Sequence, residues 1–77
     1  MYTPEQVRAI LAGASGTKDR EWPRMPLVID QLSRMGIVMT RRVTYANGAV
    51  TTLHLGLSPF GLQEARRLGA FGAKQLV

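Results

Sequence analysis

The chain has 77 residues, a formal net charge of +5 and a hydrophobic content of 45%. This length allows one small domain and excludes a TIM barrel, a kinase or a two-domain dehydrogenase, while the absence of cysteine excludes disulfides, thiolate zinc sites and cysteine catalysis. The excess of basic over acidic residues predicts a polyanionic partner, such as nucleic acid, an acidic protein face or anionic lipid.

Residues 1–14 are predicted to form a helix. Thr3 is expected to cap its N-terminus, Pro4 fits the first helical position, and Gln6 stands three residues after the cap, as in a capping box. Gly13 and Gly16 are expected to end the helix. Its apolar residues recur at helical spacing and form one stripe, which consists of Val7, Ile10, Leu11 and Ala14.

Residues 15–25 show no clear hydrophobic period and include Pro23. We expect at most one short helical turn here, around Lys18–Glu21. Trp22 is the only tryptophan, and its large ring is expected to cover the core as a lid.

Residues 26–35 are predicted to form a second helix, which begins at Pro26 and ends before Gly36. The stripe expected to face the core consists of Met25, Val28, Ile29, Leu32 and Met35. The opposite face carries Leu27, Asp30, Gln31 and Arg34.

Residues 37–57 are predicted to form a β-hairpin, because strand-forming residues flank Asn47-Gly48, which favours a two-residue turn with positive φ at both positions. Such a turn pairs Tyr45 with Val50, Val43 with Thr52 and Arg41 with His54. The hairpin face that is expected to join the core then contains Val38, Leu53, Leu55 and Leu57. The other face contains Met39, Arg41, Val43, Tyr45 and Val50.

Residues 58–71 are predicted to form a third helix, capped by Ser58. Its buried stripe is expected to contain Leu62, Ala65, Leu68 and Phe71. We therefore predict an α+β fold of three helices and a two-stranded antiparallel hairpin, in a single domain over residues 1–71, with residues 72–77 as a frayed tail. No stretch has the pattern of a secretory signal or a membrane span, so we expect an intracellular, cytoplasmic protein.

One series of residues follows the order helix, helix, glycine, hairpin, helix. It runs through Leu32, Met35, Gly36, Ile37 and Val38, then Asn47-Gly48, and then Leu57, Ser58, Gly61 and Leu68. In this series the chain resembles the second half of the winged helix-turn-helix regulators of the MarR and PadR types. The resemblance implies a small winged helix, with the hairpin as the wing and residues 26–35 as the recognition helix. Residues 15–25 depart from the pattern, because they are too short for a full positioning helix.

Double-stranded DNA is the partner that this resemblance implies. Gln31 is then a candidate base-edge reader and Leu27 a candidate contact to a thymine methyl group, whereas Asp30 repels phosphate. Arg41 and Arg42 point to opposite faces of a strand, so at most one of them is expected to enter a groove. The remaining candidate DNA contacts are Lys18, Arg20, Arg24, Arg34 and, at the wing tip, Asn47.

The sequence predicts no catalysis. His54 stands alone among strand residues, and Ser58 in GLSPFG lacks the spacing of a nucleophile elbow and suits a helix cap. We expect no cofactor, no metal and no small-molecule substrate. The prediction is a non-catalytic DNA-binding protein, either a transcription regulator or an architectural or recombination accessory, of a size that phage-encoded proteins have.

A protein partner is the alternative. The hairpin face that carries Met39, Val43, Tyr45 and Val50 is more apolar than a solvated wing requires. Such a face predicts either a homodimer or a docked partner, and the net charge of +5 predicts that the surface of that partner is acidic. A basic interaction module, or an inhibitor of the kind that phages encode, is the corresponding function.

Overall fold

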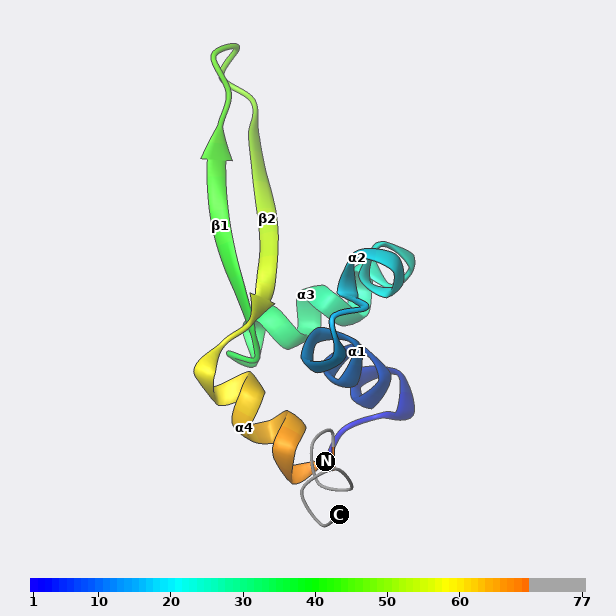
Figure 1. The fold of residues 1–77 in the computed structure, drawn as a ribbon. Coiled ribbons are helices and arrows are strands. Elements are labelled where there is room, and N and C mark those ends of the chain that lie inside the picture. Colours follow the sequence, from blue (N-terminus) through cyan, green and yellow to red (C-terminus); the bar gives the residue numbers. More distant parts are fainter. Residues whose placement is uncertain (70–77) are drawn as a thin grey trace.

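Residues 1–69 are described by the computed structural model, and they form an α+β fold with four α-helices and one antiparallel hairpin (Figure 1). In chain order the elements are α1 (Pro4–Ser15), α2 (Lys18–Glu21), the 3-10 helix η1 (Trp22–Arg24), α3 (Pro26–Arg34), β1 (Val38–Thr44), β2 (Val50–Leu57) and α4 (Pro59–Arg67). The three long helices are those that the sequence predicts. The expected position of Phe71 and the expected tail, residues 72–77, lie outside the described part of the chain.

The predicted capping box of α1 is confirmed. The Thr3 hydroxyl accepts a hydrogen bond from the Gln6 amide at 3.1 Å, and the Thr3 amide donates to the Gln6 side chain at 3.0 Å. The helix ends at Gly16, which adopts φ +87°. The prediction that Gly13 also ends it is wrong: Gly13 lies within α1, where a Cβ would come 2.8 Å from both Leu57 and Trp22. Gly13 therefore lets the last strand and the tryptophan approach the helix closely.

The segment between α1 and α3 contains the predicted short turn, α2, followed by η1. Trp22 is 6% exposed, and its indole nitrogen donates to the Ala9 carbonyl at 2.9 Å. This contact ties the segment to α1 and confirms that Trp22 covers the core.

Helix α3 buries Ile29 and Leu32, and Gly36 follows it with φ +79°, as predicted. Met35 does not join the core as expected, because it is 45% exposed at the helix end. Helix α4 is capped by Ser58, whose hydroxyl accepts from the Gly61 amide at 2.9 Å. Of the stripe predicted for α4, Ala65 is buried and Leu68 is partly buried, whereas Leu62 is 40% exposed.

The core lies where the helices meet the base of the hairpin, and its buried residues are Ala9, Ile10, Ala12, Trp22, Ile29, Leu32, Ile37, Val38, Leu57 and Ala65. Above this base the hairpin projects away from the helices, which gives the molecule extents of 52 × 21 × 21 Å (Figure 1). We call the part formed by the helices the helical body.

The predicted hairpin register is wrong by one residue. Gly48 alone in the turn has positive φ, and its amide donates to the Tyr45 carbonyl at 2.9 Å while the Tyr45 amide donates to the Ala49 carbonyl at 2.8 Å. This is a three-residue loop rather than a two-residue turn. The observed pairs are Thr44 with Val50, Val43 with Thr51, Arg42 with Thr52, Arg41 with Leu53 and Thr40 with His54. A bulge then brings Val38 opposite Leu57 at the base, so these two residues share a face, as predicted.

The register changes the two faces of the hairpin. Cross-strand partners share a face, so Leu53 lies with Arg41 and not with Val38, and Val50 lies with Thr44 and not with Tyr45. Leu53 and Leu55, both predicted to face the core, are 44% and 46% exposed. The reason is that the helices reach only the base of the hairpin, where Val38 and Leu57 are buried.

Candidate nucleic-acid interface

Four of the basic residues form ion pairs within the described chain. An Arg8 nitrogen lies 2.7 Å from the Glu21 carboxylate, and Arg34 lies 3.1 Å from Asp30 one helical turn away. Lys18 lies 3.1 Å from Asp19, and Arg67 lies 2.9 Å from Glu64. Two predicted DNA contacts, Lys18 and Arg34, are therefore partly neutralised by a neighbouring carboxylate.

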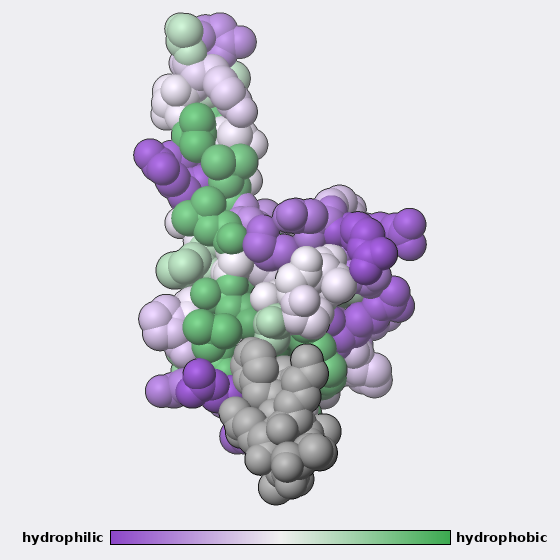
Figure 2. All heavy atoms as spheres, viewed as in Figure 1, coloured by the Kyte–Doolittle hydropathy of each residue, from purple (hydrophilic) through white to green (hydrophobic). Residues whose placement is uncertain are grey.

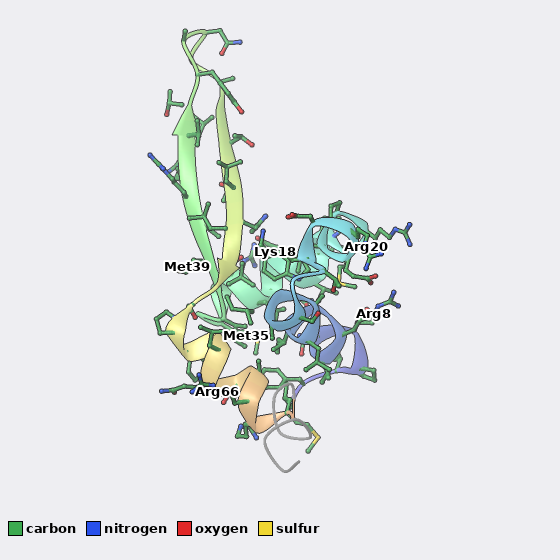
Figure 3. All side chains as sticks on the ribbon, viewed as in Figure 1. Arg8, Lys18, Arg20, Met35, Met39 and Arg66 are labelled. Atoms are coloured by element: carbon green, nitrogen blue, oxygen red, sulfur yellow. The ribbon has the colours of Figure 1, made fainter. Side chains whose placement is uncertain are left out.

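Four other arginines are exposed and form no ion pair within residues 1–69, and they are Arg20, Arg24, Arg41 and Arg42. Two of them lie on α2 and η1, and the other two are neighbours on β1. Figure 3 shows Arg20 pointing away from the hairpin. Arg24 lines a cleft of about 520 Å³ together with Glu5 and Glu21, so carboxylates lie near this arginine.

The outer face of α3 lacks the charge expected of a recognition helix. Asp30 is held against Arg34, and the Gln31 side-chain oxygen accepts a hydrogen bond from Gln6 at 3.2 Å. Leu27 is 78% exposed and therefore remains accessible. Gln31 must release its contact with α1 before it reads a base edge.

A corner joins the helical body to the hairpin. A cleft of about 330 Å³ is lined by Lys18, Trp22 and Pro26 from the helices and by Thr52, Leu53 and His54 from β2. The Lys18 ammonium stands 5.9 Å above the Trp22 ring, and Figure 3 shows this side chain between α2 and β2. The corner therefore places one cation where the two parts of the molecule meet.

The two faces of the hairpin differ in chemistry. The face that we call the Arg42 face contains Thr40, Arg42, Thr44, Val50, Thr52 and His54. The face that we call the Arg41 face contains Met39, Arg41, Val43, Tyr45, Thr51 and Leu53. At the hairpin base the Arg42 face continues into Val38 and Leu57, which pack on the core, so it is the face turned toward the helical body.

Asn47 lies at the hairpin tip, as predicted, but its side chain is occupied. The Asn47 side-chain oxygen accepts a hydrogen bond from the Ala49 amide at 3.0 Å, which stabilises the turn. Asn47 as a whole is exposed.

At the end of the body remote from the hairpin, Tyr2 and Arg67 both bind the Glu64 carboxylate. Hydrogen bonds, first from Arg67 and then from Tyr2, lower the pKa of Glu64 to about 2. Burial, together with the Glu64 charge, raises the pKa of Tyr2 above its usual value. This cluster joins the N-terminus to α4 and lies away from the hairpin (Figure 1).

The sequence did not reveal which polar residues share a hairpin face with Arg42. These residues are Thr40, Thr44, Thr52 and His54. The available signal was the alternation of Thr40, Arg42 and Thr44 along β1, and the one-residue register error assigned Thr52 and His54 to the opposite face.

The chain matches no protein-family model, no curated protein and no solved structure. Within residues 1–69, no helix is long and apolar enough to cross a membrane. The same residues include no group of three or more His, Asp or Glu side chains arranged to hold a metal ion.

Proposed function

We propose that this chain is a small winged-helix protein that binds double-stranded DNA without catalysis, as a regulator or an architectural accessory. The observation that carries the proposal is where the uncompensated positive charge lies. Arg20 and Arg24, which form no ion pair within residues 1–69, are on the α2–η1 segment, and Arg41 and Arg42, which also form none there, are on the hairpin. Arg8 and Arg67, by contrast, are neutralised by carboxylates elsewhere on the helical body.

The shape supports a duplex seated between the hairpin and α2. Figure 2 shows hydrophilic side chains over α2, next to the point where the hairpin rises from the body. Arg24 on the helical side and Arg42 on the hairpin then contact phosphates, with Lys18 at the corner between them, whereas Arg20 points away from the hairpin and does not belong to this contact set. The threonine hydroxyls beside Arg42 donate to phosphate or sugar oxygens, as hydroxyl groups commonly do in DNA complexes.

Helix α3 presents few side chains that could distinguish one base from another. We therefore expect DNA binding that depends little on base sequence. Asp30 lies in the middle of the outer face of this helix, and Gln31 is bound to α1. Phosphate contacts supply affinity without sequence information. An architectural accessory therefore fits these side chains better than a regulator of one operator.

The test is fluorescence anisotropy with a labelled 20-base-pair duplex across a range of salt concentrations. We expect log affinity to fall linearly with log salt with a slope of about −3, which corresponds to roughly three or four phosphates. Replacing Arg42→Gln removes one contact and is expected to weaken binding about fivefold and to lower the slope by about 1.

Arg41→Gln is the matched control, because it makes the same charge change at the adjacent residue on the opposite face. It is expected to change duplex affinity by less than about twofold, the effect of one distant charge under screening. Absence of duplex binding at low salt contradicts the proposal. Equal losses in the two variants contradict the assignment of the Arg42 face.

A further inference from the structure

The Arg41 face is an exposed surface that the proposed DNA contacts do not use. Met39, Tyr45 and Leu53 are 43%, 53% and 44% exposed, and Val43 lies between them on the same face. Figure 2 shows that apolar side chains are exposed along the hairpin. Contiguous apolar side chains on a projecting element indicate a protein contact.

Arg41 gives this face an unbalanced charge. It has Met39 and Val43 on either side along β1 and Leu53 opposite on β2, and it forms no ion pair within residues 1–69. No Asp or Glu occurs anywhere in residues 31–63. An occupant of this face must therefore bring its own carboxylate.

A second copy of the chain does not meet this requirement. Face-to-face pairing of two hairpins brings two Arg41 side chains together without a carboxylate, and each copy carries a net charge of +5. Charge complementarity therefore favours an acidic partner over a homodimer.

The free edge of β1 offers such a partner main-chain hydrogen-bonding groups. The sheet in the described chain has two strands, so one edge of β1 pairs with β2 and the other has no strand beside it. The free edge of β2 borders the corner cleft, where α2 lies close. An extended segment is therefore able to add to β1 through main-chain hydrogen bonds, with alternate side chains next to Met39, Arg41 and Val43.

We infer that the Arg41 face and the free edge of β1 bind an extended protein segment with the pattern apolar-x-acidic-x-apolar. The acidic side chain lies beside Arg41, and the two apolar side chains lie beside Met39 and Val43. The pattern is symmetric, so it applies to a parallel or an antiparallel strand. This inference does not depend on DNA binding, because it uses the opposite face of the hairpin.

The test uses two synthetic peptides with blocked ends, TVTDTVT and TVTNTVT. Both place residue 4 on the same side as the two valines, and they differ only in whether that residue carries a negative charge. Titration into isotope-labelled protein, followed by amide NMR, is expected to give an affinity about fivefold higher for the first, the size of a favourable cross-strand charge pair. The shifted amides are expected to be those of residues 39–43.

Arg41→Gln is expected to abolish the preference between the two peptides, whereas Arg42→Gln is expected to keep it. In Arg41→Glu, the peptide TVTKTVT is expected to become the preferred ligand. The same amide spectra report whether each variant is folded. The inference is overturned if neither peptide binds, if both bind equally, or if the shifts fall outside the hairpin. A dimer in sedimentation that dissociates in Leu53→Ser also overturns it and assigns the face to a second copy.

Discussion

The helical body and the hairpin differ in how far their basic and apolar side chains are paired or buried. In the body, carboxylates neutralise Arg8, Arg34 and Arg67 and the ring of Trp22 is buried, although Arg20 and Arg24 form no ion pair within residues 1–69 and Leu27 is exposed. On the hairpin, Arg41 and Arg42 have no carboxylate within the strands, and Leu53 and Leu55 remain exposed. The difference indicates that the buried core of the body supplies most of the stability, and we propose that the hairpin, together with the α2–η1 segment, supplies the contacts. Substitutions in the two parts are therefore expected to affect different measurements.

The largest expected effect comes from truncating an aromatic residue in each part. Trp22→Ala removes a buried ring and its hydrogen bond to Ala9, and is expected to cost about 3–5 kcal/mol, most of the stability of a domain this small. Tyr45→Ala, at a residue 53% exposed, is expected to cost less than about 0.5 kcal/mol. Urea unfolding followed by circular dichroism measures both, and similar losses would mean that the hairpin contributes to the core.

A glycine in α4 gives the next largest effect. A Cβ on Gly61 would lie 2.2 Å from the Ile37 carbonyl oxygen, a backbone atom that also accepts a hydrogen bond from the Ser58 amide at 2.9 Å. Gly61→Ala is therefore expected to displace α4 and to cost about 2–3 kcal/mol in urea unfolding. Gln63→Ala, at an exposed position of the same helix, is expected to change stability by less than about 0.5 kcal/mol. A loss in Gly61→Ala no larger than that control would contradict the close packing of α4 on residue 37.

Much of the body could be predicted from the sequence because its signals are local. The Thr3–Gln6 capping box, the short turn at Lys18–Glu21 and the Ser58 cap depend on residues within one helical turn of each other. The burial of Trp22 followed from its size alone.

The hairpin register could not be predicted, because a turn of either two or three residues fits the sequence around Asn47-Gly48. One residue of difference moved Leu53 to the Arg41 face and separated Val50 from Tyr45. The exposure of Leu53 depends on how far the helices reach along the hairpin, which no local pattern encodes.

The ion pairs changed the candidate site for a different reason. The pairing of Arg34 with Asp30 was visible at i,i+4 spacing, but Gln31 bonds to Gln6 across two helices. A tertiary contact of this kind engages a side chain that the sequence alone suggests is free to bind DNA.

The turn itself gives a smaller, local effect. Gly48 has φ +86°, so Gly48→Ala is expected to cost about 1 kcal/mol and to act on the hairpin rather than on the body. Amide hydrogen exchange at Tyr45 is expected to become about fivefold faster, since that amide bonds to Ala49 across the turn. Asn47→Asp keeps the oxygen that accepts from Ala49 and is expected to leave the exchange rate unchanged. Unchanged exchange in Gly48→Ala would contradict the three-residue loop.

The smallest effect concerns pH and is confined to the body. The folded pKa of Glu64 is about 2, below its usual 4.5, so its stabilising contribution is present above pH 4.5 and is lost as the pH falls toward 2. Glu64→Gln is therefore expected to lower the melting temperature at neutral pH and to flatten its decline between these two pH values. Glu5→Gln, at an exposed residue without an ion pair in residues 1–69, is expected to keep the decline of the unmodified chain. An equally steep decline in Glu64→Gln would contradict the cluster with Tyr2 and Arg67.

The central claim is that DNA binds the Arg42 face and leaves the Arg41 face free. It is tested most directly by adding an unlabelled DNA duplex to isotope-labelled protein and following every amide by NMR. We predict shifts in residues 18–24 and at the residues of the Arg42 face, among them Thr40, Thr52 and His54, with little change at Tyr2 or Glu64. Shifts concentrated on α4 and the N-terminus, or spread evenly over the chain, would contradict the account.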